Sequence, residues 1–147
     1  MIRILYSGSF LILINLIFLL TGCKNSDSVE QTVALYDTEE FKTFLDSFSR
    51  DSAFQIGHIA FPLEGMPAPK DSTYILDPDF RWTPQTWVLH KPYDDYNGTF
   101  SRSYIDLAGG IVIERVSDNS GLYTMERRFA KLSVGWNLIY YREMGKY

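Results

Sequence analysis

A stripe of four apolar side chains near residue 40 constrains the fold more than any other feature of this sequence. The four recur at the spacing i, i+3, i+4 and i+7, which places them on one face of a helix. They are Phe41, Phe44, Leu45 and Phe48. We expect the helix to span residues 37–50, with Asp37 as its N-cap and Glu40 three residues later, as in a capping box. Because an apolar stripe has to be buried, the rest of the chain must supply a covering layer.

The last third of the chain has the pattern of strands that can form this layer. Runs of β-branched and aromatic residues, separated by clusters of turn-forming residues, occupy 110–116, 122–132 and 136–141. Earlier in the chain we expect a short helix near residues 53–56, capped by Asp51, and a short strand over residues 58–63. The predicted fold class is therefore α+β, with N-terminal helices packed on a curved antiparallel β-sheet.

The start of the chain has the layout of a secretory signal peptide. One positive charge, Arg3, precedes an apolar run over residues 10–20, and small residues follow it. The end of this run resembles the lipobox of bacterial lipoproteins, formed here by Leu20, Thr21, Gly22 and Cys23. In that family the cysteine thiol receives a diacylglyceryl group, and cleavage leaves the cysteine as the first residue. Small residues before the cysteine suit entry into a protease site, and a thiolate is the nucleophile that takes the lipid.

These features predict a signal peptide at residues 1–22, a flexible tether at 23–35 and one α+β domain at 36–147. The apolar run is shorter than the roughly 20 residues of a spanning helix, so a retained membrane anchor is the less favoured alternative. Cys23 is the only cysteine, which leaves no intrachain disulfide. We expect the protein in the bacterial cell envelope, lipid-anchored to a membrane through Cys23, on its periplasmic or surface face.

Charge and spacing argue against a nucleic-acid or metal function. The chain has 14 Lys and Arg against 18 Asp and Glu, and no basic stripe of the kind that follows phosphates. Arg127 and Arg128 would point to opposite faces of a strand. The two histidines, His58 and His90, lack the spacing of a zinc site, and the acidic turns lack that of a calcium loop. We expect no nucleic-acid partner, no metal and no cofactor.

The densest group of polar and aromatic residues supplies the candidate pocket. Its members are Trp82, Trp87, His90, Tyr93, Asp94 and Tyr96. The aromatic rings could stack on a sugar ring or another flat ligand, and a histidine with an aspartate and a tyrosine could perform acid–base chemistry on reaching one cavity. The plainer alternatives are that the tryptophans belong to the core and that the acids belong to exposed turns. Catalytic residues stay unassigned.

Two further stretches resemble a family of small lipoproteins of unknown function from gut-type Gram-negative bacteria. They are residues 41–63 and 129–138, and the likeness extends over most of residues 37–142. The order of elements is also similar to the nuclear-transport-factor-2-like, cystatin-like fold. That likeness implies N-terminal helices on a curved sheet and a cone-like shape with a cavity. Proteins of that fold include enzymes, binding modules and dimerisation domains, so the likeness assigns no activity.

The function that we expect is a membrane-tethered, non-enzymatic domain that binds a small molecule, a glycan or a partner protein in a sheet-lined concavity. One alternative is a small pocket enzyme, a hydrolase or isomerase that uses the region from His90 to Tyr96. Another is an interaction scaffold that forms a homodimer.

Overall fold

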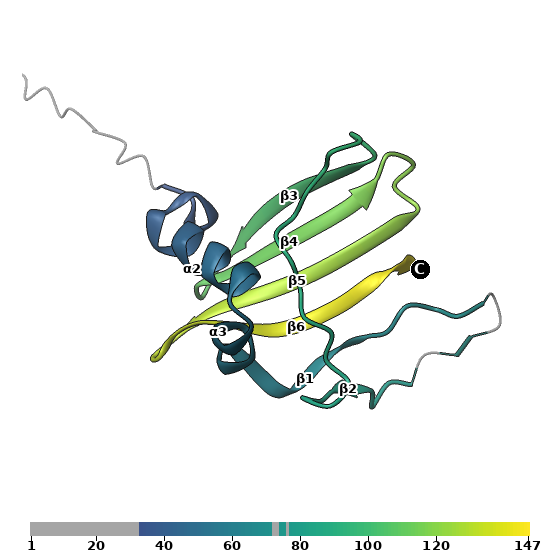
Figure 1. The fold of residues 1–147 in the computed structure, drawn as a ribbon, viewed down its shortest axis with the longest axis horizontal. Coiled ribbons are helices and arrows are strands. Elements are labelled where there is room, and N and C mark those ends of the chain that lie inside the picture. Colours follow the sequence, from purple (N-terminus) through teal and green to yellow (C-terminus); the bar gives the residue numbers. More distant parts are fainter. Residues whose placement is uncertain (1–32, 72–73, 76) are drawn as a thin grey trace, which may run out of the picture. The chain divides into compact units, whose positions relative to one another are not determined.

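One mixed sheet organises the described part of the chain. A computed structural model describes residues 33–71, 74–75 and 77–147. Within them six strands pair in the order β2-β1-β6-β5-β4-β3 (Figure 1). The strands are β1 (Ile59–Met66), β2 (Arg81–Trp82), β3 (Phe100–Leu107), β4 (Ile111–Asp118), β5 (Tyr123–Leu132) and β6 (Gly135–Lys146). The predicted signal peptide, the residues that resemble a lipobox and the predicted tether up to residue 32 lie outside the described residues.

The helical elements all precede the sheet. They are the 3-10 turn η2 (Leu35–Asp37), α2 (Glu39–Arg50) and α3 (Ser52–Gly57). Val33–Tyr147 forms one compact unit. None of the helices described in it is long and apolar enough to cross a membrane.

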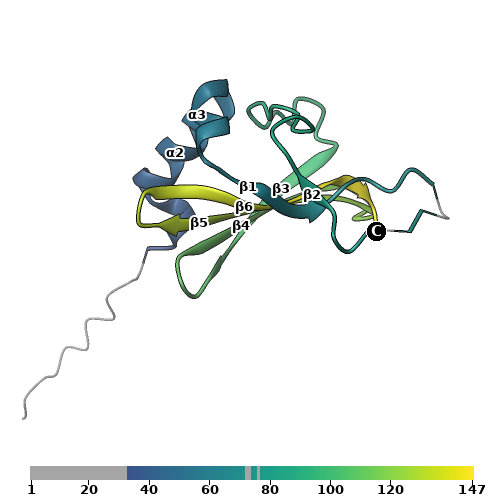
Figure 2. The ribbon, with the colours of Figure 1, turned by 90° about the horizontal axis from the view of Figure 1, so that it is seen from below.

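The predicted α+β class is confirmed, since the helices lie on one face of a curved, open sheet (Figure 2). Strands β3 to β6 pair antiparallel in chain order. The prediction of a wholly antiparallel sheet is wrong at one place, because β1 runs parallel to β6. Both strands enter the sheet from the same end, where the N–H of Leu138 donates to the carbonyl of His58 at 2.8 Å.

The caps of the two helices agree with the sequence in one case only. Asp51 caps α3 as predicted, since its carboxylate accepts from the N–H groups of the next turn. Helix α2 is capped by Thr38, whose Oγ1 accepts from the N–H of Phe41 at 3.3 Å. The predicted cap, Asp37, is wrong because this residue belongs to η2, and its carboxylate pairs with Lys42 Nζ at 2.7 Å.

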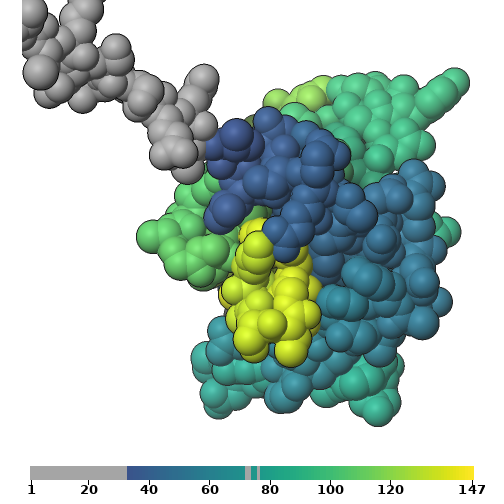
Figure 3. Space-filling model, turned by 90° about the vertical axis from the view of Figure 1, so that its left-hand side faces the viewer, coloured from purple at the N-terminus to yellow at the C-terminus, as the bar shows by residue number. Residues whose placement is uncertain are grey.

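The predicted apolar stripe of α2 forms the centre of the core. Phe41 and Phe48 are 1% and 0% exposed, and both pack edge-to-face against Phe129 of β5. Phe129 lies in one row of the sheet with Val112 and Leu138, on the face that the helices cover. Figure 3 shows the helices in blue beside the yellow end of the β5–β6 hairpin.

Residues 83–99 form a crossing segment between the two edges of the sheet. They leave β2 at one edge and reach β3 at the other, over the same face as the helices (Figures 1 and 2). The segment begins with a single turn, in which the N–H of Trp87 donates to the carbonyl of Thr83 at 3.0 Å. Strands β2 and β3, on either side of the segment, are absent from the sequence prediction.

The side chain of Gln55 joins the crossing segment to both helices. It is 1% exposed, and its Nε2 donates to the carbonyls of Phe48 at 2.5 Å and His90 at 2.9 Å. Its Oε1 accepts from the N–H of His90 at 2.8 Å and from Trp87 Nε1 at 3.0 Å. A carboxamide offers two donors and two acceptor sites, so every one of them is used here.

We expect Gln55→Leu to lower the free energy of unfolding by about 3–5 kcal/mol. The substitution leaves several buried groups without partners, and each such group costs about 1–3 kcal/mol. Urea unfolding followed by tryptophan fluorescence measures the loss. Gln85→Leu, the same substitution at an exposed turn position, is the control and should change stability by no more than about 0.5 kcal/mol. Similar small losses in both variants would contradict the role given to Gln55.

Candidate functional site

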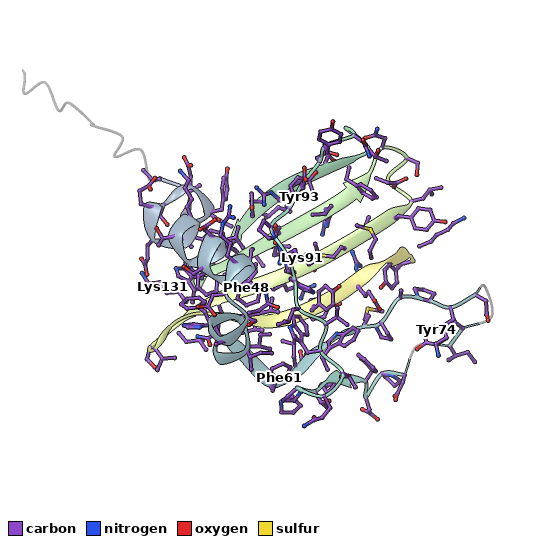
Figure 4. All side chains as sticks on the ribbon, in the orientation of Figure 1. Phe48, Phe61, Tyr74, Lys91, Tyr93 and Lys131 are labelled. Atoms are coloured by element: carbon purple, nitrogen blue, oxygen red, sulfur yellow. The ribbon has the colours of Figure 1, made fainter. Side chains whose placement is uncertain are left out.

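A cleft of about 560 Å³ opens between α2, the crossing segment and β3. Its lining includes Tyr36, Phe41, Leu45, Tyr93, Arg102 and Tyr104. Figure 4 shows Tyr93 on the crossing segment, above β3 and β4. The hydroxyl of Tyr93 donates to the carbonyl of Phe100 at 2.9 Å, which fixes this wall to the start of β3. We refer to this hollow as the tyrosine cleft.

Three tyrosine rings and one guanidinium group meet in the tyrosine cleft. The rings of Tyr36 and Tyr104 are stacked, with centroids 5.5 Å apart and planes inclined by 12°. Because alternate residues of a strand share a face, Arg102 and Tyr104 of β3 both point into the cleft. The guanidinium carbon of Arg102 lies 4.8 Å from the ring centroid of Tyr93 and 5.4 Å from that of Tyr104.

The rim of the tyrosine cleft carries charges that are already paired. Lys42 Nζ lies 2.7 Å from a carboxylate oxygen of Asp37, and Arg50 Nε lies 2.6 Å from one of Asp46. These pairs are largely exposed, so they contribute little to stability. They do, however, balance the charge of the rim. The charge that a ligand meets is therefore determined by the floor of the cleft, which Arg102 and Tyr104 of β3 form.

A row of polar side chains continues from the floor beneath the crossing segment. Tyr104, Glu114, Arg127 and Tyr141 face one another across β3, β4, β5 and β6. Glu114 is 0% exposed, and its Oε2 accepts from both Nε and Nη2 of Arg127 at 2.6 Å. Its Oε1 lies 3.6 Å from Nη1 of Arg102. One buried carboxylate is therefore shared by two guanidinium groups.

His90 lies at the other end of this row and is neutral near pH 7. Its ring centroid is 4.5 Å from those of Trp87 and Tyr141. Arg127 Nη1 lies 3.3 Å from its Nδ1, and since arginine only donates, Nδ1 accepts and the proton sits on Nε2. Burial, together with the charge of Arg127, lowers the pKa of His90 to about 3. A histidine in this state is poorly suited to act as a general base near neutral pH.

The structure separates the six residues of the predicted pocket into three groups. The rings of Trp82 in β2 and of Trp87 and His90 in the crossing segment lie together, and Trp82 is buried and donates to the carbonyl of Tyr141 at 3.0 Å. Tyr93 alone lines the tyrosine cleft. Asp94 and Tyr96 are exposed, Tyr96 to 91%. Trp82, Trp87 and His90 do not line the cleft.

Several residues of the site were not identified from the sequence. They are Tyr36, Arg102, Tyr104, Glu114 and Arg127. A signal existed for Glu114, which occupies an inward position of β4 between the buried Val112 and Val116. A charge at such a position requires a partner on the neighbouring strand. Arg127 and Arg128 do point to opposite faces as predicted, since Arg127 pairs with Glu114 and Arg128 with Glu126.

Metal-binding groups do not gather in the described ranges. No cluster of three or more His, Cys, Asp or Glu side chains there is placed to hold a metal ion.

We expect the stability of the protein to depend on the pH through His90. An unfolded histidine takes up its proton near pH 6.5, whereas His90 in the folded protein does so only near pH 3. Between these values the unfolded state binds the extra proton, so stability falls as the pH falls, by at most about 1.4 kcal/mol per pH unit.

His90→Gln, which keeps an acceptor for Arg127, should reduce this slope between pH 6 and pH 4. Urea unfolding at both pH values measures it for the wild type and the variant. The ring-proton NMR signals of His90 should keep the shifts of a neutral imidazole down to pH 4. Titration of these signals near pH 6.5 would contradict the expectation without any variant.

Comparison with known proteins gives a partial likeness of fold. Neither the protein-family models nor the curated protein sequences give a match. Among solved structures, the chain is similar to an NTF2-like protein from Bacteroides fragilis, with 18% sequence identity and a TM-score of 0.48. The match covers 72% of this chain and 47% of the other, so it spans about half the length of that protein. A likeness of this degree assigns no activity, ligand or partner to the chain.

Proposed function

We propose that the domain binds a small ligand with a flat or ring-shaped face in the tyrosine cleft. The observation that carries this proposal is the meeting of Tyr36, Tyr93, Tyr104 and Arg102 around one hollow of about 560 Å³. That volume lies within the range of about 300–1,000 Å³ that is typical of small-molecule sites. Aromatic rings with a few polar groups are the lining that such sites use, and they suit a sugar ring as well as an aromatic one.

The arrangement favours binding over catalysis. The buried carboxylate of Glu114 is held by Arg127, and the Nδ1 of His90 faces the same guanidinium. The acids of the rim, Asp37 and Asp46, are paired with basic side chains. A pocket enzyme needs a base or nucleophile that is free to react with a bound substrate. The groups around the tyrosine cleft are instead those that position and hold a ligand.

We expect the full-length protein in detergent micelles to bind phenyl β-D-glucoside or phenyl β-D-glucuronide saturably. These probes present an aromatic ring and a sugar ring, and NMR saturation transfer with titration measures their affinity. Tyr36→Leu removes an exposed stacking ring and should weaken binding by about three- to tenfold, since an aromatic pair contributes about 0.5–1.5 kcal/mol. Tyr96→Leu is the matched control, because Tyr96 is 91% exposed and lies outside the cleft. If neither probe binds, or if both variants behave alike, the proposal fails.

We further propose that a lipid on Cys23 tethers this domain to a membrane of a bacterial cell envelope. The support is the likeness of Leu20, Thr21, Gly22 and Cys23 to a lipobox, together with the polar residues 24–32 that follow. A diacylated cysteine anchors a protein stably, whereas a single acyl chain does not.

We expect the chain, expressed in a bacterium that processes lipoproteins, to fractionate with membranes. Mass spectrometry should find a mature N-terminus at Cys23 that carries the lipid. Cys23→Ser should abolish both the cleavage and the lipid, because a hydroxyl cannot replace the thiolate nucleophile. Ser26→Ala, a small change three residues further on, should leave both intact. An unmodified Cys23 in the wild-type protein would refute the tether.

A further inference from the structure

We infer that the ligand of the tyrosine cleft carries a single carboxylate and that the N–H edge of Arg102 binds it. This inference rests on the proposed function and adds the chemical class of the ligand, which is a ring compound with one acidic group. Three observations on Arg102 and its surroundings carry it: the stacking of its guanidinium group, the donors that stay unused, and the charge of the floor.

Two aromatic rings contact the guanidinium group of Arg102. Its guanidinium lies against the rings of Tyr93 and Tyr104, with distances of 4.8 and 5.4 Å from the guanidinium carbon to the two centroids. A guanidinium group contacts aromatic rings through its flat faces, while its N–H groups lie in the plane. The contacts with the two tyrosines therefore do not use the N–H donors of Arg102, which remain for an acceptor.

Most of the donors on that edge are unused. A guanidinium has five N–H donors in a fork that matches the two oxygens of a carboxylate. Among the described residues, no hydrogen bond joins the side chain of Arg102 to an acceptor, and its ion pair with Glu114 is 3.6 Å long. That distance exceeds the usual 2.7–3.2 Å of an N–H···O hydrogen bond. The side chain is 34% exposed and lines the cleft, so its free donors are accessible from there.

The charge of the floor points to one negative charge on the ligand. Arg102 and Arg127 share the single carboxylate of Glu114, and Arg127 makes both of the short contacts with it. Burial, with a smaller contribution from Glu114, raises the pKa of Tyr104 to about 12, so its hydroxyl adds no charge. Of the two β3 residues that line the cleft, Arg102 carries the charge, and its long contact with Glu114 leaves that positive charge incompletely paired. A carboxylate balances it, whereas a phosphate monoester would bring about −1.5 to −2 charges at pH 7.

The experiment compares three probes on full-length protein in detergent micelles by NMR titration: phenyl β-D-glucuronide, phenyl β-D-glucoside and phenyl β-D-glucoside 6-phosphate. The first two differ only in a carboxylate in place of a hydroxymethyl group. We expect the glucuronide to bind at least about tenfold more tightly than the glucoside, as a charge-assisted fork allows. The advantage should shrink between 50 mM and 500 mM NaCl because salt screens the partly exposed charge.

Arg102→Gln should remove the preference, so that the variant binds the glucuronide no more tightly than the glucoside. Arg128→Gln is the matched control and should keep the preference, because Arg128 lies on the other face of the sheet beside Glu126. Equal binding of glucuronide and glucoside by the wild type would overturn the inference that the ligand carries a carboxylate, and would leave the proposed function standing. Tighter binding of the phosphate would also overturn it. If no probe binds, the inference and the proposed function fall together.

Discussion

The four hydrogen bonds of the Gln55 carboxamide are the interaction on which the site depends. They join the end of α2, helix α3 and the crossing segment, three pieces of chain that share no strand pairing. The crossing segment has neither helix nor strand to satisfy its backbone, so its polar groups need partners elsewhere. Tyr93 follows His90 by three residues, so the bonds from Gln55 to His90 hold this wall of the tyrosine cleft from one side, and the hydrogen bond from Tyr93 to the carbonyl of Phe100 holds it from the other. The core beneath keeps the helices on the sheet, and Gln55 fixes where the crossing segment lies on that core.

The period of two along β5 builds a different ion network on each face of the sheet. Arg127 points to the helix-covered face and binds Glu114, while Glu126 and Arg128 point to the opposite face. There Glu126 also lies 2.8 Å from Arg115 and 3.7 Å from Arg142. Although burial raises the pKa of Glu126, the hydrogen bonds from Arg115 and Arg128 outweigh it and hold that pKa below its usual range. In both networks guanidinium groups outnumber the carboxylate, although the whole chain has a net charge of −4. The sheet is thus locally basic within an acidic protein. On the helix-covered face Arg127 makes the short contacts with Glu114, so the charge of Arg102 is the less completely paired one.

The parts of the fold that the sequence predicts are those that local periodicity determines. The stripe of α2, the Asp51 cap and the strands of the last third all follow from residues close to one another in the chain. Strand β3 escapes this kind of prediction because it is an edge strand. One of its faces is exposed throughout, and on the other only Tyr104 and Asp106 are partly buried, so its sequence shows no apolar alternation. The parallel pairing of β1 with β6 joins segments about 80 residues apart, and no local signal specifies it. Gln55 is one glutamine in a short helix, and only the tertiary structure gives it four partners.

The difference between features set by neighbouring residues and features set by tertiary contacts also explains why the predicted pocket and the tyrosine cleft share only Tyr93. Tryptophans grouped in a sequence indicate a large apolar area, and burying that area in the core satisfies them as well as a ligand would. Trp82 and Trp87 are used in this way, together with Tyr141. A candidate binding residue is recognised instead by a donor that the folded protein leaves unused, as in Arg102. The unused donors of Arg102 depend on the register that places its guanidinium group near Glu114. The wall opposite depends on Asp106, whose carboxylate binds the N–H groups of Leu35 and Tyr36 and so brings Tyr36 over β3. Since these contacts join residues that are distant in the chain, the cleft becomes visible only once the strands are paired.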